Sequence, residues 1–248
     1  MRLQKKVALV TGAAQGLGAA IAKRFAEEGA TVFVADFQDG NAVVSEIVSG
    51  GGHAYYIPLD VSNELSWVSA VKDVDRIAGR LDILVNNAGI NIRESIEEMQ
   101  VESLDRMLAV NVKGPFLGCK HFLPMMKRGG GGSIINMSSQ CGLIGHKYTT
   151  EAYTVTKGAV TLLTKTVAVR HAAANIRSNC LCPSTVDTPL IQELFKNPDR
   201  RAERLGEVPL ARLCTALDVA NAALFLASDE GAYLNGVALP VDGGSTAD

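Results

Sequence analysis

Short apolar segments alternate with helical patterns along the whole chain of 248 residues. Seven segments rich in Val, Ile and Leu have the length of β-strands, at 6–12, 31–36, 54–61, 81–89, 133–139, 176–183 and 237–244. Helical patterns lie between them, at 17–30, 40–50, 63–79, 101–128, 151–172 and 216–228, while 188–214 is less regular. Apolar strands separated by helices indicate a parallel sheet covered on both faces. We therefore predict a doubly wound α/β fold of about seven strands in one domain, 1–248.

The first predicted strand runs into a glycine-rich stretch, TGAAQGLG at 11–18, which opens the first predicted helix. In such a loop Gly12 allows the tight turn, Gly16 lets the backbone approach a pyrophosphate, and Gly18 lets the helix pack on the strand. Free N–H groups and the positive dipole end at the helix start attract phosphate. The spacing is G-x-x-x-G-x-G, not the more common G-x-G-x-x-G, but strand, loop, helix and the strand-ending Asp36 occur in the required order. The sequence therefore predicts a Rossmann-like, dinucleotide-binding domain.

Tyr153 and Lys157 lie four residues apart in the stretch AYTVTKGAV, which has a helical pattern. Side chains at this spacing are neighbours on a helix, and an isolated pair is more often solvated than catalytic. A cation about 4 Å from a phenol is worth ~4 kcal/mol at an effective dielectric of about 20, which lowers the tyrosine pKa by about three units. We therefore expect Lys157 to lower the pKa of Tyr153 and make the phenol a usable base.

Several motifs occur together in one order: TGAAQGLG, NNAG at 86–89, Asn111, NMSS at 136–139, YTVTK at 153–157 and the C-terminal VDGG. Over essentially the whole chain this set resembles the short-chain dehydrogenase/reductase family. The resemblance implies a single-domain Rossmann enzyme, usually a homotetramer, that moves hydride between NAD(P) and an alcohol or carbonyl. It implies that Tyr153 is the general acid/base and that Ser139 binds the substrate oxygen. It also implies that Lys157 holds the nicotinamide ribose and that Asn111 positions a relay water.

The same resemblance implies the cofactor-binding positions. Asp60 matches the residue beside the adenine, although it also reads as a turn residue at a strand end, and Val186 and Thr188 match positions that hold the carboxamide. The full set is Gly12, Gln15, Gly16, Leu17, Gly18, Asp36, Phe37, Asp60, Val61, Asn87, Ala88, Gly89, Tyr153, Lys157, Pro183, Val186 and Thr188.

The chain departs from the family pattern at two places. The interval from Ser139 to Tyr153 is one residue longer than the most common spacing, so GHKYTTEA is expected to carry an extra loop residue over the active site. Ser184 stands where the family usually has Gly, which can alter the backbone beside the carboxamide. Ser138 is an alternative hydroxyl, but the second serine of the pair, Ser139, is the one that matches.

Asp36 favours NAD over NADP. It ends the second strand, where an acid can accept hydrogen bonds from both hydroxyls of the adenosine ribose. Positions that carry a cation in NADP-binding relatives hold Ala14, Gln15, Phe37 and Gln38. A 2′-phosphate would face the carboxylate, and repulsion plus the lost hydrogen bonds amount to at least ~2–3 kcal/mol, roughly a hundredfold in specificity.

Composition argues against several other functions. The net charge of −2 gives no basic surplus for nucleic-acid binding. No apolar run approaches the ~18 residues of a membrane span, and the apolar run near the start is too short for a signal peptide, so we expect a cytoplasmic protein. The five cysteines and four histidines have no repeated spacing, so neither a disulfide framework nor a metal site is predicted.

Three functions remain open. The first is an NAD-dependent alcohol dehydrogenase or ketone reductase for a small secondary alcohol or its ketone. The second is a same-fold lyase or epimerase that recycles bound NAD; such relatives usually carry an extra C-terminal substrate domain, which we do not expect in 248 residues. The third is a non-catalytic NAD-binding scaffold, which would be expected to have lost part of the Ser/Tyr/Lys set.

The substrate pocket is expected around 91–94, 140–148 and 189–208. The last segment mixes Leu190, Ile191, Leu194 and Phe195 with charges, which predicts an amphipathic lid that orders on binding. An apolar lid favours an alicyclic or aromatic alcohol. The basic residues Arg200, Arg201 and Arg204 indicate a solvated helix face more often than an anion site.

The segment AVTLLTKTVAV, 159–169, is apolar on more than one face. Such a helix can pack against its own sheet and against a partner helix. Together with the family resemblance, this pattern predicts a homotetramer.

Overall fold

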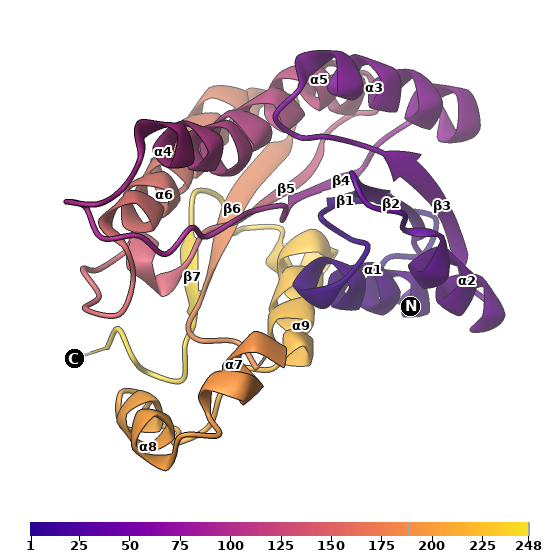
Figure 1. The fold of residues 1–248 in the computed structure, drawn as a ribbon. Coiled ribbons are helices and arrows are strands. Elements are labelled where there is room, and N and C mark those ends of the chain that lie inside the picture. Colours follow the sequence, from indigo (N-terminus) through magenta and orange to yellow (C-terminus); the bar gives the residue numbers. More distant parts are fainter. Residues whose placement is uncertain (188, 248) are drawn as a thin grey trace.

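Seven parallel strands pair in the order β3-β2-β1-β4-β5-β6-β7 in the computed structural model, which describes residues 1–187 and 189–247 (Figure 1). The strands are β1 (Val7–Thr11), β2 (Thr31–Asp36), β3 (His53–Pro58), β4 (Ile83–Asn86), β5 (Gly132–Met137), β6 (Ile176–Pro183) and β7 (Ala238–Val241). β1 and β4 are buried along their whole length, as expected for central strands covered on both faces. The predicted doubly wound sheet is confirmed.

The strand order reverses between β1 and β4. From β1 the chain proceeds outward to β2 and β3, and then returns to pair β4 with the other side of β1, with Leu9 opposite Leu84. Loops that leave the carboxyl ends of these two neighbouring strands diverge to opposite faces of the sheet. The crevice that opens between them is where doubly wound folds bind ligands.

Helices cover both faces of the sheet (Figure 1). One face carries α1 (Gly16–Glu27), α2 (Asn41–Ser49) and α9 (Ala216–Ala227), and the other carries α3 (Glu64–Ala78), α5 (Gly114–Arg128) and α6 (Glu151–His171). On the first face, Phe25 and Leu224 lie in one apolar cluster. On the second, Trp67 packs edge-on against Phe122, and its indole N–H donates to the carbonyl of Val61 at 2.9 Å. This bond anchors the chain at the end of β3.

The helix predicted over 101–128 is interrupted. The structure has α4 (Val101–Leu108), a π-helical turn (Ala109–Lys113) and then α5. The turn holds Asn111, whose side chain leaves the helix to bond with a neighbouring loop. A π-turn adds one residue to the helical circuit and is common at functional sites. The predicted helical region over 101–128 is present, but periodicity does not register the one extra residue of the π-turn.

The less regular segment contains two short helices, α7 (Pro189–Leu194) and α8 (Pro198–Gly206). α8 begins with a strong local signal, because the Asn197 side chain accepts from the N–H groups of Asp199 and Arg200 and Pro198 occupies the first turn. Short 3-10 turns lie at Gln140–Gly142, Ala172–Ala174 and Asp229–Gly231. Within the described residues, no helix is both long and apolar enough to cross a membrane.

Candidate active site

A cleft of about 550 Å³ opens at the carboxyl ends of the central strands. Most of the predicted cofactor residues line it: Gly12, Gln15, Leu17, Asp36, Phe37, Asp60, Val61, Asn87, Ala88, Gly89, Tyr153 and Lys157. The fold therefore brings the glycine-rich loop, the strand-ending acids and the Tyr/Lys pair to one cavity. Of the other predicted positions, Gly16 and Gly18 belong to the loop itself, Pro183 and Val186 lie at the end of β6, and Thr188 lies outside the described residues.

The glycine-rich loop is held against the neighbouring strand. The Thr11 hydroxyl accepts the N–H groups of Asn87 and Ala88, each at 3.0 Å. The Asn87 side-chain amide donates to the carbonyls of Thr11 and Gly12, at 2.8 and 3.2 Å. A Cβ on Gly12, whose φ is +64°, would lie 2.8 Å from the Cα of Ala88. Only glycine fits so close a contact between the two strand ends.

The start of α1 is open toward the cleft. Gln15 precedes the helix without a side-chain cap, and the first turn carries no acid, so the first N–H groups of α1 have no partner from the described chain. Gly16 has a φ of +59° and nothing within 4 Å of where a Cβ would stand, whereas a Cβ on Gly18 would lie 2.2 Å from the Gly12 carbonyl oxygen. Uncapped N–H groups at a helix start and an unobstructed backbone fit the pyrophosphate of a dinucleotide.

Asp36 has a structural task that the sequence did not reveal. One carboxylate oxygen accepts the N–H of Ala14 at 2.9 Å and the other accepts the N–H of Gln38 at 3.0 Å. The side chain is only 6% exposed. It therefore ties the glycine-rich loop to the end of β2. Each oxygen keeps a second lone pair that can accept from a ribose hydroxyl.

Arg106 is a cleft residue that sequence reasoning missed. It lies on α4, one helical turn before Val110, and both residues line the cleft. Its guanidinium makes no hydrogen bond or ion pair with any residue that the structure describes. The glycine-rich loop and β2 carry no Lys or Arg at the cleft. The fold instead supplies a cation from α4, because Arg106 lines the same cleft as Asp36. No local signal pointed to it, because α4 reads as an ordinary amphipathic helix.

The predicted catalytic side chains converge at the ends of β5 and α6. Thr150 caps α6 by accepting the N–H of Tyr153 at 3.4 Å, which places Tyr153 in the first turn. Ser139 follows β5 and is 8% exposed, and its hydroxyl oxygen accepts the N–H of Cys141 at 3.2 Å. The Ser138 hydroxyl instead bonds to the carbonyl of Lys157 at 3.0 Å. Ser138 therefore fixes α6 to the sheet, and Ser139 is the serine beside Tyr153.

Asn111 joins α6 to the loop after β4. Its side-chain oxygen accepts the N–H of Ile90 at 2.8 Å, and its amide donates to the Ile90 carbonyl at 2.8 Å and to the Thr156 hydroxyl at 3.1 Å. A Cβ on Gly89 would lie 3.4 Å from both the Asn111 oxygen and the Lys157 ammonium. Asn111 is thus a neighbour of Lys157 beside Gly89.

The expected lowering of the Tyr153 pKa is not found. Burial raises the pKa of Tyr153 to about 12, and hydrogen bonding from Ser139 only partly opposes it. Burial also lowers the pKa of Lys157 to about 8. The Lys157 ammonium donates to the carbonyl of Met137 at 2.8 Å and lies 5.5 Å from the centre of the Tyr153 ring. The prediction of a lowered pKa was wrong because it counted only the attraction between the two charges and omitted desolvation, which dominates both groups.

The strand end that is expected to face the carboxamide is partly irregular. Val186 forms an isolated parallel bridge with Cys214, and the N–H of Ser184 donates to the carbonyl of Val241 at 3.2 Å. The Ser184 hydroxyl is buried without a hydrogen-bond partner among the described residues. The Ser184 backbone is therefore tied to the end of β7, and its side chain leaves one unsatisfied hydroxyl.

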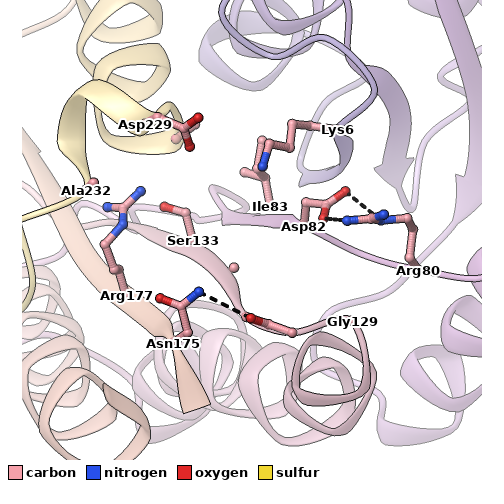
Figure 2. Close-up of a pocket in the computed structure, with 14 residues that line it drawn as sticks. Lys6, Arg80, Asp82, Ile83, Gly129, Ser133, Asn175, Arg177, Asp229 and Ala232 are labelled. Atoms are coloured by element: carbon pink, nitrogen blue, oxygen red, sulfur yellow. Dashed lines mark hydrogen bonds and ion pairs between the residues drawn. The ribbon is translucent and has the colours of Figure 1, made fainter. Parts of the chain in front are cut away.

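A second cavity, of about 300 Å³, lies at the opposite end of the sheet, where β4, β5 and β6 begin (Figure 2). Its charged residues hold the fold together. Arg80 pairs with Asp82, whose carboxylate also accepts the N–H of Val7 at 2.8 Å, and Arg177 donates to the carbonyl of Leu226 at 2.7 Å. None of the predicted site residues lies there. Across the described chain, no group of three His, Cys, Asp or Glu side chains could hold a metal ion.

Known proteins match nearly the whole chain. Residues 12–246 match a family described as enoyl-(acyl carrier protein) reductase. The 2,5-dichloro-2,5-cyclohexadiene-1,4-diol dehydrogenase of Sphingobium indicum is 42% identical over 245 residues, which cover 98% of this chain and 97% of that protein. The cyclopentanol dehydrogenase of a Comamonas species is 40% identical over 248 residues, 99% of each chain. The chain belongs to the short-chain dehydrogenase/reductase family.

Solved structures agree with this assignment. The gluconate 5-dehydrogenase of Burkholderia cenocepacia, in complex with NADP and tartrate, is 30% identical and has a TM-score of 0.94, covering 100% of this chain and 97% of that one. The family description names an enoyl reductase, but the full-length relatives are alcohol and diol dehydrogenases. They support oxidoreductase activity of the alcohol-dehydrogenase type.

Replacing Lys157 with Met should alter the pH dependence of stability. The pKa of Lys157 is lowered from 10.5 to about 8 in the folded chain. Between these values the unfolded chain binds more protons, so the wild-type protein gains stability as the pH rises. From pH 7 to pH 9 the wild type should gain on the order of 1 kcal/mol over Lys157→Met.

Urea unfolding of both proteins at the two pH values measures this difference. The lost bond to Met137 destabilises the variant equally at each pH and cancels in the comparison. A stability difference that does not change with pH would contradict the buried ammonium.

Proposed function

We propose that this chain is an NAD-dependent dehydrogenase that oxidises a small alicyclic secondary alcohol to its ketone and catalyses the reverse reduction. The observation that carries this proposal is that Tyr153 and Lys157 line a cleft that fits a dinucleotide, with Ser139 hydrogen-bonded to Tyr153. The alicyclic substrate is supported by the relatives, whose names state that they act on cyclopentanol and on a dichlorocyclohexadienediol.

In the proposed mechanism, the Ser139 hydroxyl donates to the substrate oxygen and Tyr153 exchanges a proton with it. Because the pKa of Tyr153 is raised, the phenol is protonated at neutral pH and ready to donate to a ketone oxygen. Lys157 contributes a buried ammonium beside the phenol, and Asn111 fixes the loop next to that ammonium. A bound nicotinamide supplies the hydride donor or acceptor and, when oxidised, a positive charge near the phenol. Both cations favour the phenolate that alcohol oxidation needs.

The two alternative functions give different results in one assay. Steady reduction of added NAD by alicyclic alcohols, followed at 340 nm, supports the dehydrogenase. Product turnover without net reduction would indicate a lyase or epimerase, and cofactor binding without turnover would indicate a scaffold. The scaffold is disfavoured because the Ser/Tyr/Lys set is complete, with Tyr153 and Lys157 in one cleft and Ser139 bonded to Tyr153.

Tyr153→Phe should abolish turnover, because it removes the group that carries the proton. The affinity for NADH should change less than about threefold, since the ring remains. Tyr233→Phe is the matched control, because Tyr233 is fully exposed. Steady-state rates with cyclopentanol and NADH fluorescence titrations check both expectations. More than a small fraction of wild-type activity in Tyr153→Phe would refute the role of the phenol.

The choice of NAD over NADP remains a proposal that rests on Asp36. Arg106 and the NADP-bound relative argue for some tolerance of a 2′-phosphate. The anchored carboxylate argues more strongly against it, because its two bonds to Ala14 and Gln38 prevent it from turning away. We expect kcat/KM to favour NAD by about a hundredfold.

Asp36→Ala with Phe37→Arg should move the preference toward NADP. Asp36→Asn is the control, because it removes the charge and keeps one oxygen that can hold the glycine-rich loop. The ratio of kcat/KM for the two cofactors is the measurement. Equal values for the wild-type protein would refute the argument.

A homotetramer is also proposed. Val155, Leu162 and Val169 recur every seven residues on α6, and their side chains are 60–81% exposed. Such a stripe on a helix whose other face is buried suits a partner helix.

Leu162→Glu should dissociate the assembly, whereas Leu65→Glu, at an exposed position on α3, should not. Light scattering measures the mass, and a wild-type monomer at micromolar concentration would contradict the proposal.

The cytoplasmic location of the protein stays a prediction.

A further inference from the structure

The loop before Tyr153 holds α8 through an aromatic ring. The Arg204 guanidinium carbon lies 3.8 Å from the centre of the Tyr148 ring, and the Lys147 ammonium lies 4.5 Å from it. The Tyr148 hydroxyl donates to the carboxylate of Glu203. One side chain thus makes an aromatic–cation contact and a charge-assisted hydrogen bond with neighbouring residues of α8.

Two ion pairs flank this contact: Glu207 lies 3.7 Å from the guanidinium of Arg204, and Lys147 lies 3.9 Å from Glu203. Glu207 also lies 3.5 Å from a ring nitrogen of His146, whose pKa is lowered by burial. We call these six residues the clasp: His146, Lys147, Tyr148, Glu203, Arg204 and Glu207. The Arg204 side chain is only 18% exposed, so its charge is largely enclosed by these partners.

The other side of the loop is fixed to the catalytic residues. The Cys141 thiol donates to the Thr149 hydroxyl at 3.2 Å, and the N–H of Cys141 donates to Ser139 at 3.2 Å. Thr150 then caps the helix at Tyr153. The loop that carries Tyr148 therefore begins and ends at the two residues proposed to touch the substrate.

α8 has little else to hold it. None of its residues is fully buried; Leu205 is half-buried, and the buried apolar side chain that follows, Val208, lies just beyond the helix. Its chain leaves the end of β6 through α7 and returns to β7 through α9 (Figure 1). The segment therefore crosses from the expected carboxamide side of the cleft to the loop before Tyr153, and the clasp fixes its far side.

We propose that Tyr148 is a positioning residue that holds α8 beside the substrate and thereby sets the affinity for the alcohol. The proposal rests on the proposed dehydrogenase function. It gives a function to the loop between Ser139 and Tyr153, which is one residue longer than is common in the family. It also assigns Arg204 to Tyr148 and Glu207, so that Arg204 is not an anion receptor.

Kinetics of Tyr148→Ala and Tyr148→Phe with NAD and cyclopentanol test the proposal. Tyr148→Ala should raise KM for the alcohol at least tenfold and leave kcat within about twofold, because Tyr153 and Ser139 stay in place. Tyr148→Phe keeps the ring under Arg204 and should return KM to within about threefold of wild type. An unchanged KM in Tyr148→Ala, a loss confined to kcat, or no rescue by Phe would each overturn it.

Limited trypsin digestion gives a readout that needs no activity. Arg200 and Arg201 are exposed on α8 and offer cleavage sites. Tyr148→Ala should be cut there at least about fivefold faster than wild type with an unchanged melting temperature, and the exposed-site control Tyr233→Ala should not. Equal cutting rates would overturn the clasp. If no alcohol is oxidised by the wild type, the proposed function fails, and the digestion still decides whether Tyr148 holds α8.

Discussion

The seam between β1 and β4 is the contact on which the site depends. At this point the strand order reverses, and two loops leave neighbouring strands for opposite faces of the sheet. Asn87 closes the seam by donating to Thr11 through both its backbone and its side chain, and Gly12 allows the backbones to meet at a distance that a Cβ would forbid. Because the seam holds these segments together, the start of α1 and the loop after β4 line one cavity. The cofactor site is therefore a consequence of strand order as much as of the glycine motif.

The active site is costly to fold. Lys157 is buried with a single bond to the Met137 carbonyl, and burial moves its pKa and that of Tyr153 in directions that disfavour both charges. A well-packed surface pair would not show this. Strongly shifted pKa values of this kind are typical of functional sites, where a bound ligand supplies further charge. The proposed chemistry gives this cost a purpose, because a cationic nicotinamide favours the phenolate.

Two arginines reach the proposed site from helices that are distant from it in the sequence. Arg106 reaches the cofactor cleft from α4, and Arg204 reaches the catalytic loop from α8. Each lies in a helix that reads as solvated when taken alone. The ring of Tyr148 and the carboxylates of Glu203 and Glu207 convert the basic face of α8 into a contact inside the protein. The same reasoning explains the charged cavity at the other end of the sheet, where Arg177 and the Arg80–Asp82 pair serve backbone groups.

The sequence by itself determined the seven strands and the glycine-rich loop after the first strand, because both follow from local periodicity. It also determined that this loop, the acids and the Tyr/Lys pair meet at one edge of the sheet, because the carboxyl ends of parallel strands lie together. It also marked the longer loop before Tyr153. Tertiary structure alone decided the π-turn at Asn111, the loop-holding bonds of Asp36 and the pKa directions of Tyr153 and Lys157. It also decided the position of Arg106 in the cleft and the partners of Arg204. The physical reason is the same in each case. Desolvation and contacts between distant segments depend on what surrounds a residue in space. Periodicity in the sequence indicates only which face of its helix or strand the residue occupies.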